Sequence, residues 1–225
     1  MAYFVVMIKV HIHEDDVGIR NLYPASALRE ISDDLSVVQA SFEKNRSPDG
    51  LGWSEIHIVQ EPENSFLSLN PKLADIVSVI ELELPRIDEF EVGFGSDNPL
   101  HHFERDALCY GFGRHLYLKL DADGDDLRAI WYEARSRDPE ELLALRRAIE
   151  AVDGVQPLML ADYWLNLGGL VRDSEFLDRY FGVISEAAAK REAAIQPSGP
   201  EQYAPAHKIG GWFAGLIKSV LGRVS

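Results

Sequence analysis

Apolar positions follow a helical period over the last eighteen residues of the chain, Lys208 to Ser225. The apolar side chains recur at spacings of three and four, at Ile209, Trp212, Phe213, Leu216, Ile217, Val220, Leu221 and Val224. This spacing predicts an amphipathic C-terminal helix over 208–225, with one continuous apolar stripe. Residues 196–207 contain proline and glycine, and we expect them to link this helix to a single domain formed by residues 1–195.

The C-terminal helix is expected to fold only when its stripe is covered, because a helix this short and glycine-containing is marginal in isolation. Three surfaces can provide the cover: the chain's own domain, a partner protein or second copy, or a bilayer surface. A partner would bury the side chains at the centre of the stripe, which are Trp212, Phe213, Leu216 and Ile217.

The pattern over residues 1–195 predicts an α+β domain with a mostly antiparallel sheet and helices concentrated in the C-terminal third. Alternating or continuous apolar runs predict strands at 2–13, 35–42, 53–59, 75–84, 114–120, 127–135 and 156–165. A short helix is expected after Pro24. Two longer helices are expected, one capped by Asp138 and one capped by Asp173 or Ser174. Residues 85–113 show no convincing period and predict an irregular segment.

Charge restricts the class of partner. The chain of 225 residues has 22 Lys and Arg against 37 Asp and Glu, a net charge of −15. Such a charge repels nucleic acid, which we exclude as a partner, and it disfavours an anionic membrane surface. It suits a basic protein, although acidity also serves solubility alone. The single cysteine, Cys109, and the lack of a long apolar run lead us to expect a cytoplasmic protein.

The densest group of reactive side chains lies in the predicted irregular segment. His101, His102, Glu104 and Asp106 are the candidates for general acid and base catalysis there, and Cys109 with a histidine is an alternative nucleophile. No flanking motif supports either chemistry. The alternative is a polar surface loop without a catalytic role.

Metal and cofactor motifs are incomplete, so no metal and no cofactor is predicted. The acidic run 121–126 lacks the glycine and glutamate of a calcium loop and predicts a hairpin turn. His11 and His13 share one face of a predicted strand, but a third zinc ligand is missing and Lys9 lies on the same face. The Gly-Phe-Gly runs at 93–95 and 111–113 lack the continuation of a phosphate loop and predict turns or bulges. Glu81 and Glu83 are expected on one solvated strand face.

The function that we expect is that of an acidic protein-binding module, for example an immunity-type inhibitor that neutralises a basic toxin domain. Possible aromatic anchors are Trp131, Tyr132, Tyr163 and Trp164. The first alternative is a hydrolase-like enzyme with its site at 97–115. The second is a peripheral membrane or assembly subunit that docks through the C-terminal helix. Composition and patterning alone leave all three open.

Overall fold

The computed structural model describes residues 8–13, 17–47, 59, 61–93 and 102–194, with the side chains of 188–194 left out. The predicted linker and C-terminal helix, including Trp212, Phe213, Leu216 and Ile217, lie outside these residues. Most of the strand predicted at 53–59 also lies outside them.

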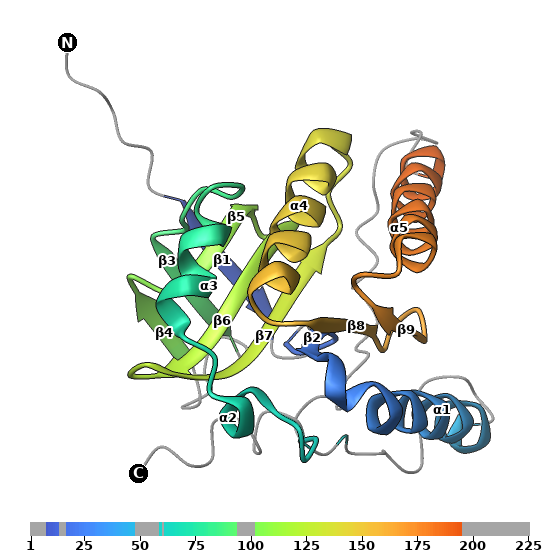
Figure 1. Ribbon diagram of the computed structural model, residues 1–225. Coiled ribbons are helices and arrows are strands. Elements are labelled where there is room, and N and C mark those ends of the chain that lie inside the picture. The colour runs from blue at the N-terminus through green and yellow to red at the C-terminus, as the bar shows by residue number, and fades with distance from the viewer. Residues whose placement is uncertain (1–7, 14–16, 48–58, 60, 94–101, 195–225) are drawn as a thin grey trace.

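Nine strands and five α-helices form within the described residues (Figure 1). The strands are β1 (Lys9–His13), β2 (Arg20–Pro24), β3 (Glu89–Gly93), β4 (His102–Arg105), β5 (Cys109–Gly113), β6 (Leu116–Asp123), β7 (Asp126–Ala134), β8 (Leu158–Asp162) and β9 (Leu167–Leu170). The helices are α1 (Leu28–Asn45), α2 (Phe66–Leu69), α3 (Leu73–Ile80), α4 (Pro139–Val155) and α5 (Ser174–Ala194).

The strands form two sheets. Sheet A has the order β1-β3-β4, with β1 parallel to β3 and β4 antiparallel to it. Sheet B has the order β5-β6-β7-β2-β8-β9, and all of its pairs are antiparallel. The expected α+β fold with mostly antiparallel strands is therefore confirmed.

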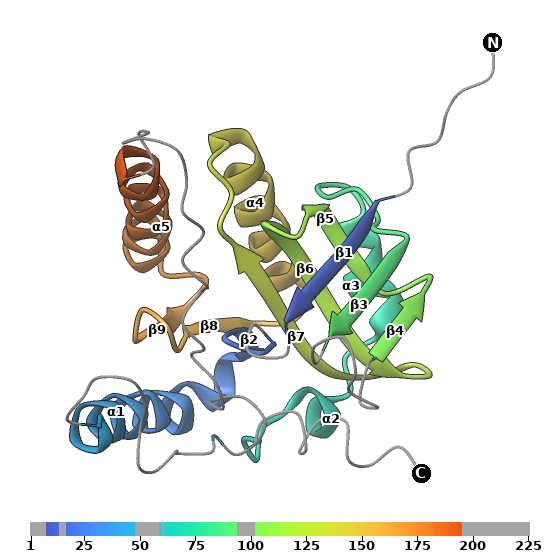
Figure 2. The ribbon, with the colours of Figure 1, turned by 180° about the vertical axis from the view of Figure 1, so that it is seen from behind.

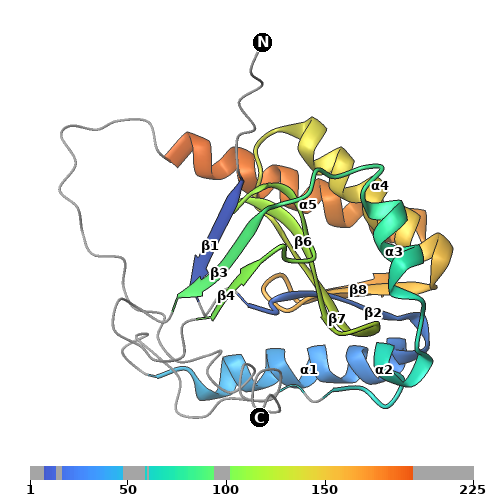
Figure 3. The ribbon, with the colours of Figure 1, turned by 90° about the vertical axis from the view of Figure 1, so that its left-hand side faces the viewer.

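Sheet A and α1 cover one face of sheet B, and α3, α4 and α5 cover the other (Figures 2 and 3). Sheet A lies against β5, β6 and β7, and α3 and α4 lie on the other face of these strands. At the far end of sheet B, α1 packs on β8 and β9 through Ile31 and Leu35, which join one apolar cluster with Met159. This arrangement leaves β5–β7 buried on both faces.

An aromatic group fills the space between the two sheets. Phe90 of β3, Tyr117 of β6 and Trp131 of β7 contact one another edge to face, with ring centroids 5.6 to 5.8 Å apart. Edge-to-face contact is a favourable geometry for aromatic rings because the positive ring edge meets the negative face. Trp131 is therefore a core residue and not the surface anchor proposed from the sequence, and Tyr132 is likewise buried.

The two longest predicted helices are confirmed with their caps. The Asp138 side chain accepts a hydrogen bond from the Glu140 amide (2.9 Å), and Pro139 is the first residue of α4. Asp173 accepts hydrogen bonds from the amides of Glu175 and Phe176 and begins α5. Both caps satisfy amides that the helix itself leaves without a partner.

Two predicted strands are helices, and the helices are not concentrated in the C-terminal third. The strand predicted at 35–42 belongs to α1, whose buried residues Ile31, Leu35 and Val38 follow a helical spacing. The strand predicted at 75–84 overlaps α3, with Ile76 and Ile80 buried one turn apart. Glu81 and Glu83 therefore share no strand face.

Residues 85–113 are more regular than the sequence suggested, because they contain β3, β4 and β5. The alternation in β3 buries Phe90 and Val92 and leaves the alternate residues Glu89 and Glu91 partly exposed. These strands supply one wall of the space between the sheets.

A buried polar network joins β2, β7, β8 and α5. The Arg20 guanidinium donates to Glu133 Oε1 (2.7 Å) and to Asp162 Oδ2 (2.9 Å), and Tyr180 donates to the same oxygen of Asp162 (3.0 Å). Tyr132 in turn donates to the Tyr180 hydroxyl (2.7 Å). Burial alone would lower the pKa of Arg20, but the two carboxylates raise it above its ordinary value. The guanidinium is therefore charged and compensated inside the fold.

Replacing Asp162 by alanine should destabilise the protein strongly. Asp162 is fully buried, and its loss removes one of the two carboxylates that compensate the buried Arg20 charge. Breaking a buried ion pair in this way costs about 3–5 kcal/mol of unfolding free energy, measurable by urea titration. Asp178→Ala, which breaks an exposed pair with Arg146, is the matched control and should cost less than about 1 kcal/mol. Equal costs for the two variants would contradict a structural role for the network.

Candidate functional site

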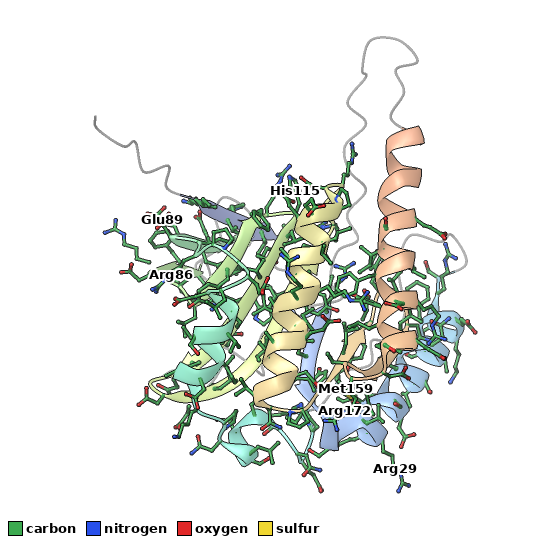
Figure 4. The ribbon with its side chains drawn as sticks, turned by 45° about the horizontal axis from the view of Figure 1, so that its top comes forward. Arg29, Arg86, Glu89, His115, Met159 and Arg172 are labelled. Atoms are coloured by element: carbon green, nitrogen blue, oxygen red, sulfur yellow. The ribbon has the colours of Figure 1, made fainter. Side chains whose placement is uncertain are left out.

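A cleft of about 830 Å³ lies where three segments meet. It is lined by residues 11–13 of β1, by the β5–β6 turn, and by the connection from β7 into α4. Its lining side chains are those of His11, Ile12, His13, Arg114, His115, Arg135, Ser136, Arg137, Asp138 and Glu141. Figure 4 shows His115 beside the end of α4 that the chain enters from β7.

A β-bulge shapes the turn that carries Arg114 and His115. The β5–β6 pairing shifts register between Gly111 and Gly113, which confirms the bulge interpretation of the 111–113 run. Both glycines have positive φ, at 152° and 131°. A Cβ on Gly111 would lie 2.3 Å from the Leu116 carbonyl oxygen, so no side chain fits there.

The connection from β7 to α4 is held by its own polar contacts. The Arg135 amide donates to the His115 carbonyl (2.7 Å), which fixes this connection beside the β5–β6 turn. Ser136 is buried, accepts a hydrogen bond from the Asp138 amide (3.1 Å) and donates to Glu141. Because the Ser136 hydroxyl already donates one hydrogen bond and accepts another, it is a structural group rather than a free nucleophile.

The third wall of the cleft comes from the end of β1. Alternation in β1 places Val10 and Ile12 in the core and exposes Lys9, His11 and His13, as predicted. The His11 ring lies over Gly93 of β3, where an added Cβ would come within 2.7 Å of the ring. Its Nδ1 lies 3.2 Å from a carboxylate oxygen of Glu91. Gly93 and Glu91 together set the orientation of this imidazole.

The cleft gathers positive charge on an acidic protein. Among the described residues that line it, three arginines face two carboxylates, and both carboxylates already accept hydrogen bonds at the start of α4. Arg135 is held by Glu133, with Nε 2.9 Å from a carboxylate oxygen. Within the described part of the chain, no carboxylate lies at ion-pair distance from Arg114 or Arg137. These two guanidiniums are therefore available to a negatively charged ligand.

Two of the predicted catalytic residues meet elsewhere, at the edge of the space between the sheets. In β4, Nε2 of His102 lies 2.7 Å from Oε1 of Glu104. The other carboxylate oxygen of Glu104 lies 3.1 Å from the Lys119 ammonium of β6. Asp121 accepts hydrogen bonds from Lys119 (2.9 Å) and from the Trp131 indole (2.8 Å). We call His102, Glu104, Lys119 and Asp121 the Lys119 cluster.

The Lys119 cluster is saturated with internal contacts. Lys119 is only 2% exposed, and its ammonium also donates to the Leu120 carbonyl (3.0 Å). Burial alone would lower the pKa of Lys119, but Asp121 and Glu104 raise it, so the group stays charged. Three acceptors satisfy its three N–H groups. The cluster therefore joins the two sheets, and its lysine keeps no free N–H group for acid or base catalysis.

The remaining predicted catalytic residues do not complete a site. His101 lies outside the described residues. Asp106 is exposed at the β4–β5 turn with a φ of 52°, and its carbonyl accepts from the Arg86 guanidinium (2.8 Å). Burial raises the pKa of the Cys109 thiol to about 12, so this group is not a thiolate nucleophile at neutral pH.

Sequence reasoning missed most of the cleft. The histidines of β1 were considered only as zinc ligands and Asp138 only as a helix cap, whereas Arg114 and His115 fall at the end of the 97–115 region suggested for an enzyme. Among the described residues, no three His, Cys, Asp or Glu side chains come close enough to hold a metal ion. The recognisable signal was the run Arg135-Ser-Arg-Asp138, a pair of arginines at the start of a helix on an otherwise acidic chain.

Within the described residues, no helix combines the length and apolar character needed to cross a bilayer. The chain matches no protein-family model, and no significant similarity was found to curated proteins or to solved structures. Its function has to be argued from its own residues.

The stability that His102 contributes should depend on pH. Its hydrogen bond to Glu104 raises the pKa of His102 above 6.5. The protonated imidazole is thus favoured by folding, so its contribution is full below pH 6.5 and is lost as the pH rises through the raised value. Urea titrations should show a larger destabilisation by His102→Gln at pH 5.5 than at pH 9.

Arg105→Gln, on the exposed face of the same strand, is the control for the His102 variant. Arginine stays charged over this pH range, so its effect should be the same at both pH values. A destabilisation by His102→Gln that is constant, or larger at pH 9, would contradict the role given to His102.

Proposed function

We propose that the protein binds a small anionic ligand in the cleft between β1, the β5–β6 turn and the start of α4. The observation that carries this proposal is the pair of guanidiniums, Arg114 and Arg137, that line the cleft without a carboxylate partner among the described residues. A guanidinium presents a fork of N–H donors that fits carboxylate and phosphate groups. On a chain with 37 acidic residues, two such groups in one concavity favour ligand binding over a general surface role.

The dimensions and rigidity of the cleft support a specific ligand rather than a counter-ion. Its volume of about 830 Å³ falls in the range of about 300–1,000 Å³ typical of small-molecule sites. Arg135 connects the cleft to the buried network, because Glu133 contacts both Arg135 and Arg20. A wall anchored in this way is held in position before the ligand arrives, which reduces the entropy cost of binding.

An enzyme with the predicted catalytic residues is less well supported. His102 and Glu104 lie in the Lys119 cluster rather than in the cleft, and the cleft hydroxyl of Ser136 is already bonded. A binding or sensing role needs only the cationic groups. We therefore propose ligand binding without assigning a reaction.

A second candidate function is the binding of a basic protein, including an immunity-type role. Trp164, in the β8–β9 turn, supports it because 58% of its surface is exposed. The turn is rigid, since the Leu165 amide donates to the buried Asp162 (2.9 Å) and Asn166 has a φ of 51°. A fixed, exposed tryptophan on an acidic protein is a suitable anchor for a basic partner.

Removing both available guanidiniums should weaken anion binding. Each hydrogen bond from a charged donor contributes about 1.5–3 kcal/mol, so Arg114→Ala with Arg137→Ala should weaken inorganic phosphate binding at least about tenfold. Isothermal titration calorimetry on the full chain measures this affinity. The control is Arg29→Ala with Arg172→Ala, which removes the same charge far from His115 (Figure 4). An equal loss of phosphate affinity in both double variants would mean that binding depends on the net charge of the protein and not on the arginines of the cleft.

Replacing Trp164 by alanine should reduce capture of a basic protein partner from an extract of the native cell. High ionic strength should also release the partner, because screening weakens the attraction between opposite surface charges. Leu82→Ala is the matched control, since Leu82 is an apolar residue with 81% of its surface exposed on another part of the molecule. Capture that survives Trp164→Ala and high salt would argue against this second function.

A further inference from the structure

We infer that the ligand of the cleft is a polar organic phosphate, such as a phosphorylated sugar. This inference rests on the proposed function and specifies the ligand class. It follows from how the positive charge is concentrated, from the polarity of the lining and from the size of the cleft.

The arginines of the cleft come from two chain segments that lie side by side. The hydrogen bond between the Arg135 amide and the His115 carbonyl (2.7 Å) holds two chain segments side by side. Arg114 directly precedes one partner of that bond, and Arg137 is two residues beyond the other. Positive charge concentrated in this way suits an anion that carries two charges on one centre, which is the property of a phosphate monoester near neutral pH.

The third arginine is pre-oriented for the same group. Its Nε is engaged by Glu133 at 2.9 Å, and the carboxylate of Glu133 is itself only 3% exposed. Glu133 thus anchors the Arg135 side chain at the wall of the cleft. A phosphate monoester has three terminal oxygens, one more than a carboxylate, so it offers more acceptors to a group of guanidiniums.

The described side chains of the lining favour a polar ligand. Ile12 is the one apolar side chain among the residues that line the described part of the cleft, and it is almost fully buried. A fatty acid would leave its chain against histidine, arginine and carboxylate groups, which would lose their hydration without compensation. A hydrophilic organic part, such as one with the hydroxyl groups of a sugar, suits these described side chains better than an alkyl chain.

The cleft is larger than a phosphate ion needs. A single water molecule occupies about 30 Å³ of liquid, and the cleft measures about 830 Å³. Room remains beside the phosphate for an organic part, bordered by His11 and His13 on the β1 side. A polynucleotide is disfavoured as the source of the phosphate, because the net charge of −15 repels an extended polyanion.

Two variants test the assignment without removing an arginine. Asp138→Asn takes one negative charge from the lining but keeps the helix cap, since asparagine caps as well as aspartate. It should tighten phosphate binding by about threefold or more, as expected for a nearby like charge at the protein surface. Gly93→Ala adds a Cβ that would meet the His11 ring at 2.7 Å and displaces this imidazole from its place on the β1 wall.

The experiment is isothermal titration calorimetry of the full chain with ribose 5-phosphate, inorganic phosphate, ribose, succinate and a polyuridylate. We expect ribose 5-phosphate to bind more tightly than inorganic phosphate, and succinate to bind at least about tenfold more weakly than ribose 5-phosphate. Ribose alone should not bind. Gly93→Ala should weaken ribose 5-phosphate more than inorganic phosphate, because His11 borders the organic part.

The outcomes separate the two levels of the proposal. Succinate that binds as tightly as ribose 5-phosphate would overturn the phosphate assignment but leave anion binding intact. Polyuridylate that binds more tightly than ribose 5-phosphate would overturn the small-molecule assignment. If no anion binds, and Asp138→Asn does not introduce binding, the proposed function itself fails.

Discussion

The burial of one guanidinium determines how the rest of this fold is arranged. Arg20 enters the core from β2, and its charge can remain there only because Asp162 of β8 and Glu133 of β7 converge on it. The order β7-β2-β8 brings these residues together, so the polar network and the strand order require one another. Tyr180 extends the network to α5, and Arg135 extends it to the cleft. The core and the candidate ligand site are thus connected through the contact between Glu133 and Arg135.

The second constraint is the way in which sheet A covers sheet B. A strand pair such as β6–β7 would expose one face if only helices packed on it, and Lys119 would then be an ordinary solvated lysine. Sheet A covers that face, so Lys119 is enclosed and must be neutralised by Glu104 and Asp121. Sheet A also ends beside the β5–β6 turn, and this placement makes β1 a wall of the cleft.

The sequence was sufficient to predict those elements whose local pattern was unambiguous. The caps at Asp138 and Asp173 and the β6–β7 hairpin were predicted because they depend on neighbouring residues. The α3 region was predicted as a strand, because positions 76, 80 and 84 satisfy both an alternating and a helical pattern. Leu82 distinguishes the two, being inward in a strand but 81% exposed here. The cleft escaped prediction because its residues come from segments about 20 to 120 positions apart that only the tertiary fold unites.

The position of Cys109 has a practical consequence. Its thiol is enclosed between the sheets, and burial raises its pKa to about 12, so it should react slowly with maleimides at neutral pH. A fluorophore can then be attached at a new cysteine on the rim of the cleft while the native residue stays in place. The emission of such a dye would follow ligand entry in real time, with the chain otherwise unaltered.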